Sequence, residues 1–251
     1  MDRLRFLVDL HGPADRQGPG SDQATRQAIA LSGLAPSPAL RIADLGCGTG
    51  ASALVLAAEL GAEVTAIDVQ PDFLNRLAQR ADAARLADRV TGVEASMTAP
   101  PFADGSLDAI WSEGAIYNLG FDEGIARWRR YLKPGGILAV SDLCWLTPDR
   151  PAELQHLWAT AYPGIGTVPD RIAALEREGY VLQGYFPLDP SCWMENYYHP
   201  IEARFAEMRT AHPGDADTAR MIEAESREIE IYRRYGAWYS YGFFVARKSD
   251  L

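Results

Sequence analysis

Length, composition and charge restrict the class of protein first. The chain has 251 residues and 47% hydrophobic content, which suits one large domain or two small ones around a sizeable core. Its formal net charge of −10 disfavours a nucleic-acid partner, because binding to a phosphate backbone needs a basic face. Charges interrupt the apolar residues of the start, MDRLRFLVDL, so we expect neither a secretory leader nor a membrane span, and we place the protein in the cytoplasm.

Cysteine and histidine spacing argues against two further kinds of site. The three cysteines, Cys47, Cys144 and Cys192, lie far apart without a paired spacing, so we expect no disulfide framework. The four histidines form no pair that would place two ligands on one helical face. We therefore expect no metal site.

Strand and helix patterns alternate along the middle of the chain. Short apolar runs indicate strands, and segments of helix formers follow them. Five strands linked by helices predict a parallel, doubly wound α/β sheet, whose ligands bind beyond the carboxyl ends of the strands. The predicted strands are RIADL (41–45), EVTAID (63–68), RVTGVEA (89–95), LDAIW (107–111) and ILAVSDLCW (137–145), with helices over 51–61, 71–87 and within GIARWRRYLKPGG.

Two more strands, GYVLQGYFPL and WYSYGFFVARK, are separated by segments with helical patterns that are too long for a hairpin connection. We therefore predict a helical lid over an acceptor pocket. The charges along EAESREIEIYRR within it are typical of a solvated helix face. The expected fold is a Rossmann-like doubly wound seven-stranded sheet with helices on both faces. It forms a single domain with an N-terminal cover (1–38), a core (39–189), the lid (190–235) and a final strand (236–251).

The first strand leads into a glycine-rich turn, ADLGCGTG. Gly46, Gly48 and Gly50 permit positive φ angles and close approach of a ligand to the backbone, and the following helix offers its free N–H groups. Asp68 stands twenty positions after Gly48, where a carboxylate accepts hydrogen bonds from ribose hydroxyls. Glycine spacing alone also fits a nicotinamide dinucleotide. Asp44, however, is unfavourable beside a pyrophosphate and favourable beside an ammonium group, which favours S-adenosylmethionine.

Together, ADLGCGTG, the acid of AIDVQ and the LKPGG turn resemble the class I S-adenosylmethionine-dependent methyltransferases. RQGPGS (16–21), SMTAPPF (96–102) and WSEGAIYNLGF (111–121) further resemble a bacterial small-molecule methyltransferase group. The resemblance implies S-adenosylmethionine as cofactor, S-adenosylhomocysteine as product and a small-molecule methyl acceptor. The cofactor residues that it implies are Asp44, Gly46, Cys47, Gly48, Gly50, Asp68 and Val69, with Ser96 and Met97 preferred to Glu94 beside the adenine.

The stretch WSEGAIYNLGF places a carboxylate, a phenol and an amide at the end of the fourth strand. Trp111 is expected in the core, whereas Glu113 emerges at the ligand rim as a contact to the cofactor or acceptor ammonium, or less favourably as a general base. Tyr117 is either a half-buried packing residue or a pocket residue that supports the methyl group or the acceptor. Asn118 is a further candidate for acceptor binding.

The cover and the lid supply the remaining candidates. The loop that contains Gln17 precedes Ser21, a predicted helix N-cap, and either folds over the ligands or is a plain surface loop. At the leading edge of the lid, Trp193, Tyr197 and Tyr198 either contact the acceptor or pack the lid onto the sheet. His199 is a second candidate for acceptor proton chemistry.

Two classes of function fit these residues. The favoured one is an enzyme that transfers a methyl group to a small molecule, mainly through alignment and removal of water. The alternative is a cofactor-binding protein with a regulatory or complex-forming role, and a nicotinamide-dependent reductase is a weaker third. Oligomeric state cannot be read from the residues, and a homodimer is compatible with the aromatic final strand.

Overall fold

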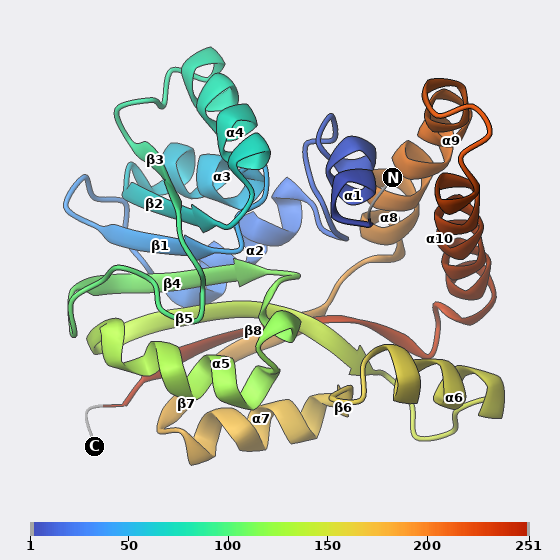
Figure 1. Cartoon of the computed structure of the whole chain (residues 1–251). Helices are drawn as coiled ribbons and strands as arrows, with labels where there is room; N and C mark the ends of the chain where they lie inside the picture. Colours follow the sequence, from blue (N-terminus) through green and yellow to red (C-terminus); the bar gives the residue numbers. More distant parts are fainter. Residues whose placement is uncertain (1–2, 250–251) are drawn as a thin grey trace.

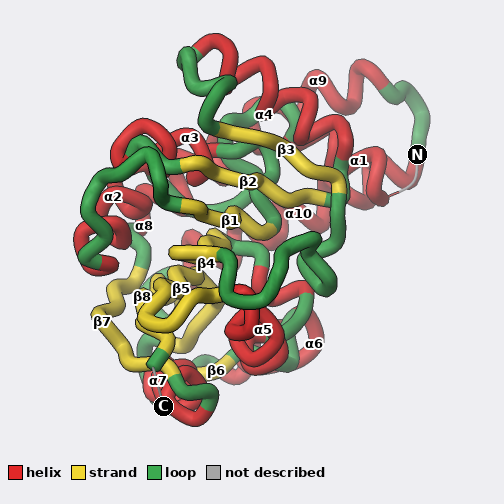
Figure 2. Tube along the Cα trace, turned by 90° about the vertical axis from the view of Figure 1, so that its left-hand side faces the viewer, coloured by secondary structure: helices red, strands yellow, loops and turns green. Residues whose placement is uncertain are grey.

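The strands form one sheet with the doubly wound order. In the computed structural model, which describes residues 3–249, this order is β3-β2-β1-β4-β5-β8-β7, and a two-residue strand, β6, pairs with β5 outside this path. Figure 2 shows the sheet between its two edges, β3 and β7. The strands are β1(Arg41–Leu45), β2(Glu63–Asp68), β3(Val90–Glu94), β4(Leu107–Glu113), β5(Leu132–Trp145), β6(Gly166–Thr167), β7(Tyr180–Pro187) and β8(Tyr239–Lys248).

One strand of the sheet, β8, runs against all the others. β3, β2, β1, β4 and β5 are parallel, whereas β8 runs antiparallel to both β5 and β7. The predicted seven strands are therefore confirmed as the main path. β6 was missed because two residues carry no readable alternation.

Helices cover both faces, as predicted. One hydrophobic cluster joins the sheet to α2, α3, α4 and the lid, and a second joins it to α5 and α7. In β1, Ile42 belongs to the first cluster and Ala43 to the second, because successive side chains of a strand point to opposite faces. These helices are α2(Asp22–Ser32), α3(Ala51–Leu60), α4(Pro71–Ala83), α5(Phe121–Trp128) and α7(Val168–Arg177), with α6(Ala152–Ala161) beyond the end of β5.

The predicted helical lid is present between β7 and β8. It consists of α8(Pro190–Trp193), the π-helical segment η3(Met194–Tyr198), α9(His199–Ala211) and α10(Ala216–Tyr235). Figure 1 shows these helices and α1(Arg3–His11) gathered beyond the carboxyl ends of the parallel strands. The N-terminal residues and the lid thus meet at the edge of the sheet where ligands of doubly wound proteins bind.

Two strands differ in length from the prediction. β4 continues past Trp111 because Ser112 and Glu113 pair with Val140 and Ser141 of β5. β5 begins at Leu132, which pairs with Leu107, so the LKPGG segment lies within this strand. Glu113 is therefore held by the sheet and does not belong to a loose rim.

Candidate functional site

The glycine-rich turn connects β1 to α3 with three left-handed backbone positions. The φ angles of Gly46, Gly48 and Gly50 are +74°, +53° and +82°, which side-chain-bearing residues rarely adopt. A Cβ atom on Gly46 would collide with Ala115, and one on Gly48 would collide with Gln17. Glycine is thus required here both for backbone conformation and for close packing.

Asp68 is fixed beside this turn. Its Oδ2 atom accepts a hydrogen bond from the Gly48 N–H at 2.9 Å, and its Oδ1 atom accepts one from the Gln70 N–H at 2.9 Å. Partial burial raises the pKa of the Asp68 carboxyl, and the backbone hydrogen bonds oppose that shift. Each carboxylate oxygen keeps a further lone pair that can accept another hydrogen bond, as the predicted ribose contact requires.

Asp44 lies fully buried beneath the turn at the end of β1. Its Oδ2 atom accepts a hydrogen bond of 2.7 Å from the Ser52 hydroxyl, whereas its Oδ1 atom has no hydrogen-bond partner. Burial raises the pKa of Asp44 to about 7, against the hydrogen bond from Ser52. An orphaned buried carboxylate oxygen fits a cationic group nearby, although Asp44 itself is not in the wall of the cavity described below.

A cavity of about 730 Å³ opens over the turn and extends beneath the lid. Of the predicted site residues, Asp44, Gly50, Tyr198 and His199 lie outside its wall, and the others line it. His199 is exposed, and Tyr198 is buried in the lid, where its hydroxyl donates to Glu228 at 3.0 Å. The structure therefore does not place Tyr198 or His199 in the cavity wall, where acceptor contact was predicted. In the π-helical segment η3, Tyr197 is the residue that lines the cavity.

The end of β3 provides the wall expected beside an adenine. Val69, Ser96 and Met97 line the cavity, whereas Glu94 is exposed and does not. The Met97 carbonyl accepts a hydrogen bond of 2.9 Å from the indole N–H of Trp128, which fixes this segment. The position of the side chains favours Ser96 and Met97 over Glu94.

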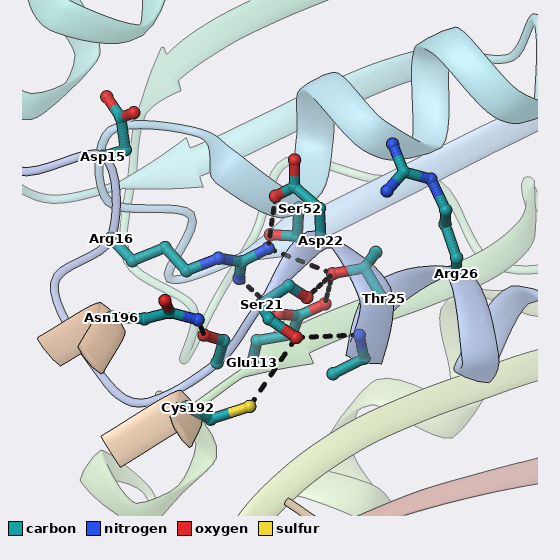
Figure 3. A network of polar contacts seen from close by, with 12 residues as sticks. Asp15, Arg16, Ser21, Asp22, Thr25, Arg26, Ser52, Glu113, Cys192 and Asn196 are labelled. Atoms are coloured by element: carbon teal, nitrogen blue, oxygen red, sulfur yellow. Dashed lines mark hydrogen bonds and ion pairs between the residues drawn. The ribbon is translucent and has the colours of Figure 1, made fainter. Parts of the chain in front are cut away.

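Glu113 is the centre of a polar network, drawn in Figure 3. Its Oε2 atom accepts from Arg16 Nη1 at 2.7 Å, and its Oε1 atom accepts from the Thr25 hydroxyl at 2.7 Å. The Trp111 indole N–H also donates to Oε1, at 2.9 Å. Arg16 also contacts Asp22 at 3.1 Å. Trp111 is fully buried, as predicted. Three donors on one carboxylate favour the positioning role of Glu113 over proton abstraction.

Arg16 belongs to the site although no local pattern in the sequence singles it out within the RQGPGS stretch. This loop contacts the lid as well as β4, because the Asn196 amide donates to the Gly20 carbonyl at 2.8 Å and Cys192 Sγ lies 3.6 Å from the Ser21 hydroxyl. Ser21 caps α2 as predicted, accepting from the Ala24 N–H at 3.0 Å. The loop thus covers the site, one of the two alternatives left open by the sequence.

Gln17 lines the cavity, but its amide is bound to the chain itself. Its Oε1 atom accepts from the Thr49 N–H at 2.7 Å, and its Nε2 atom donates to the Thr49 hydroxyl at 3.1 Å and to the Ala14 carbonyl at 3.0 Å. These bonds attach the cover to the glycine-rich turn. The geometry therefore gives Gln17 a structural role, in place of the predicted contact to the acceptor.

Tyr117 and Asn118 form part of η1(Ile116–Asn118), a short helix after β4. Tyr117 is 45% exposed and packs edge to face on Tyr162 with 6.1 Å between ring centroids. The Asn118 amide donates to the Ala115 carbonyl at 3.0 Å. Both side chains border the cavity, and support of the methyl group or the acceptor by Tyr117 stays a prediction.

Trp193 closes the cavity from the lid. It is 3% exposed, its indole N–H donates to the Ser240 hydroxyl at 3.0 Å, and its ring stacks on Tyr232 at 4.7 Å. Trp193 thus packs the lid onto β8 and also lines the cavity, and its contact to the acceptor stays a prediction. Sequence analysis missed further wall residues, namely His11, Trp158, Tyr162, Glu225, Glu228 and Tyr241.

The doubly wound sheet, the glycine-rich turn and Asp68 beside it define the class I methyltransferase fold. Residues 42–136 match the family model described as a methyltransferase domain. A methyltransferase from Geobacter sulfurreducens, solved with S-adenosylhomocysteine, superposes with a TM-score of 0.84 at 22% identity, covering 96% of this chain and 97% of that one. Residues 42–136 thus carry the signature of a methyltransferase domain, and the chain has the fold of the S-adenosylmethionine-dependent methyltransferases.

Curated relatives are similar over part of the chain. The 27-O-demethylrifamycin SV methyltransferase of Amycolatopsis mediterranei is 32% identical over 148 residues, which are 58% of this chain and 54% of that protein. The ubiquinone/menaquinone biosynthesis C-methyltransferase UbiE of Cereibacter sphaeroides is 33% identical over 151 residues, 59% of this chain and 58% of that protein. The chain thus spans little more than half the length of these two relatives.

Residues 3–249, which the structure describes, contain neither a membrane-spanning helix nor a metal-binding cluster. None of their helices is both long and apolar enough to cross a membrane. Within the same part of the chain, no three histidine, cysteine or acidic side chains are grouped so as to hold a metal ion.

Proposed function

We propose that this protein transfers a methyl group from S-adenosylmethionine to a small-molecule acceptor and releases S-adenosylhomocysteine. The observation that carries the proposal is one cavity that joins the glycine-rich turn and Asp68 to an aromatic pocket beneath the lid. No feature of the described residues favours the binding-protein alternative.

The residues around the turn fit this cofactor. The glycines leave room for the methionine portion, the orphaned Asp44 oxygen suits a nearby ammonium group, and Asp68 is oriented toward a ribose. Val69 and Met97 offer apolar contact to the adenine, and Ser96 offers a hydroxyl. The domain limits, the cytoplasmic location and the absence of a nucleic-acid partner stay predictions from the sequence.

When bound, S-adenosylmethionine supplies a methyl group on a sulfonium sulfur. This sulfur leaves readily, as the neutral thioether of S-adenosylhomocysteine. The protein therefore contributes mainly alignment and removal of water. Glu113 and Arg16 hold the N-terminal cover against β4, and Gln17 holds it against the turn. Trp193 and Tyr197 close the cavity from the lid side.

The first test is binding and transfer in one sample. The protein is incubated with methyl-deuterated S-adenosylmethionine and a metabolite extract, and mass spectrometry detects compounds that gain the labelled methyl group. S-adenosylhomocysteine binding is measured in parallel by calorimetry. Confirmed binding together with a labelled product supports the proposal, whereas saturable binding of NAD alone would overturn the cofactor assignment.

Asp68→Ala tests the cofactor site directly. We expect an affinity loss of about a hundredfold, because two charge-assisted hydrogen bonds to the ribose disappear. Asp72→Ala, at an exposed position one turn further along, is the matched control and should bind as the wild type does. Wild-type affinity in the Asp68 variant would contradict the assigned role.

A further inference from the structure

The part of the cavity beneath the lid differs chemically from the part over the glycine-rich turn. Gly114 and Tyr241 line the cavity side by side, since a Cβ atom on Gly114 would lie 2.9 Å from the ring of Tyr241. Tyr241 in turn packs edge to face on Trp193, with 4.9 Å between ring centroids. Beyond Tyr241, the wall is formed by aromatic rings and by two acidic residues of α10, Glu225 and Glu228.

Aromatic side chains dominate this end of the cavity. Ring faces carry negative electrostatic potential, so several rings around one space attract a cation. Among the described cavity-lining residues, Arg16 is the only arginine or lysine, and its guanidinium is bound to Glu113 and Asp22. The rings are those of Tyr117, Trp158, Tyr162, Trp193, Tyr197 and Tyr241.

Two carboxylates face this aromatic space from one helix. Glu225 and Glu228 are three residues apart, which places them on one side of α10, and both are partly buried. Tyr198 donates to Glu228 Oε1 at 3.0 Å and so orients that carboxylate. Burial raises the pKa of Glu228 against this hydrogen bond, and a positive charge nearby would reverse that shift.

His11 gives an independent indication of a ligand in the same cavity. Its side chain is 7% exposed, lines the cavity and stacks on Tyr197 with 5.7 Å between ring centroids. Its Nδ1 atom has no hydrogen-bond partner, which is costly for a buried polar atom. Burial lowers the pKa of His11 to about 4, so the ring is neutral at pH 7 and adds no positive charge.

We propose that the methyl acceptor carries an ammonium group, which Glu225, Glu228 and the surrounding aromatic rings hold beneath the lid. This inference rests on the proposed methyl transfer and names the class of its acceptor. An acceptor with a carboxylate or phosphate at this position would meet two like charges, and the arginine among the described cavity-lining residues, Arg16, is already bound to Glu113. The lid therefore selects small organic cations over anions of similar size.

The test uses choline as a probe of the pocket, with 3,3-dimethylbutan-1-ol as its neutral isostere. Both are titrated by calorimetry into wild-type protein saturated with S-adenosylhomocysteine. Choline should bind at least about tenfold more tightly than the neutral isostere, because only choline gains from the rings and carboxylates. The Glu225→Gln, Glu228→Gln double variant should lose at least about tenfold in choline affinity and little in affinity for the isostere.

Glu230→Gln is the matched control, since Glu230 is exposed on the same helix. It should bind choline as the wild type does. If the double variant does not fold, as judged by circular dichroism, Glu225→Gln alone is titrated and should weaken choline binding severalfold. Choline binding no tighter than the isostere, or unchanged in the folded glutamine variant, overturns the proposed acceptor class.

S-adenosylhomocysteine titration separates this inference from the function on which it rests. The Glu225 and Glu228 variants should bind S-adenosylhomocysteine with wild-type affinity, because Asp68 and the glycine-rich turn are unchanged. A wild-type protein that does not bind S-adenosylhomocysteine contradicts the proposed function itself. Binding of S-adenosylhomocysteine without preference for choline contradicts only the acceptor class.

Discussion

At the scale of single residues, the site contains carboxylates in three different environments. Asp44 is buried with one oxygen unpaired, Asp68 is held by two backbone N–H groups, and Glu113 accepts from three side chains. The environment of each group sets its chemistry more than its residue type does. Burial of the Asp44 carboxylate is unfavourable, and its effect on the stability of the protein can be measured without any ligand.

Asp44→Asn should change the pH dependence of stability. The pKa of Asp44 is raised from 3.8 to about 7 in the folded protein, so the folded state binds an additional proton between these values. The wild-type free energy of unfolding therefore falls as pH rises through this window and levels off above pH 7. The asparagine variant cannot titrate at this position, so its free energy of unfolding lacks this decrease. The difference in free energy of unfolding, variant minus wild type, should therefore rise by up to about 3 kcal/mol between pH 5 and pH 8.

Urea unfolding of both proteins at pH 5 and pH 8 measures this difference. Asp142, whose pKa burial raises to about 6 despite Arg171, titrates in both proteins, so its contribution cancels. An equal pH dependence in the variant and the wild type would show that Asp44 is ionised throughout the folded state.

At the scale of elements, the N-terminal cover depends on the end of β4. The Arg16 and Glu113 side chains are 11% and 7% exposed, so their ion pair is largely removed from water. Breaking a buried pair from one side leaves an uncompensated charge, whereas replacing both partners avoids that cost. The cover is therefore attached through a pair whose members depend on each other.

A double-mutant cycle tests this attachment. Glu113→Gln should keep the fold, lower the free energy of unfolding by about 3 kcal/mol and remove most methyl transfer. Arg16→Met should destabilise similarly, and the double variant should lose less than the sum of the two single losses. The measurement is urea unfolding with S-adenosylhomocysteine affinity in parallel. If the two single losses in free energy of unfolding add up to the loss in the double variant, Arg16 and Glu113 do not stabilise each other.

At the scale of the whole molecule, one ligand should stabilise the entire fold. The cavity is bordered by the cover, the sheet and the lid, so a bound molecule contacts segments that are far apart in the chain. S-adenosylhomocysteine at a hundred times its dissociation constant should raise the free energy of unfolding by about 2.7 kcal/mol. In Asp68→Ala the rise at the same concentration should shrink to about 0.4 kcal/mol, because the affinity of this variant is about a hundredfold lower. Thermal unfolding measures both values, and an equal rise with NAD would contradict the cofactor assignment.

Much of the core was readable because its signals are local. β1 and β2 have the predicted bounds, and the turn between β1 and α3 needs glycine wherever the backbone adopts positive φ. Hydrophobic periodicity depends only on residues close together in the sequence, so it indicates a strand or helix even when the packing partners of that element are not known. The same holds for the Ser21 cap, which is satisfied within its own helix.

Strand ends were less predictable because they depend on pairing. Ser112 and Glu113 extend β4 only because β5 lies beside them. The charges of α10 were read as a solvated face, and that prediction is wrong for Glu225 and Glu228, which line the cavity. A helix with charges on several sides does not indicate which of them will face the sheet.

The sequence by itself therefore determined the class of fold, the glycine-rich turn and the acid after the second strand, since each is encoded by residues close together in the chain. Only the tertiary structure decided that Arg16 pairs with Glu113, that Gln17 is bound to the turn, and that His199 points to solvent while Glu225 and Glu228 do not. These outcomes depend on how the cover and the lid pack on the carboxyl edge of the sheet. Packing between distant segments selects which side of each helix is buried, and no local pattern specifies that choice.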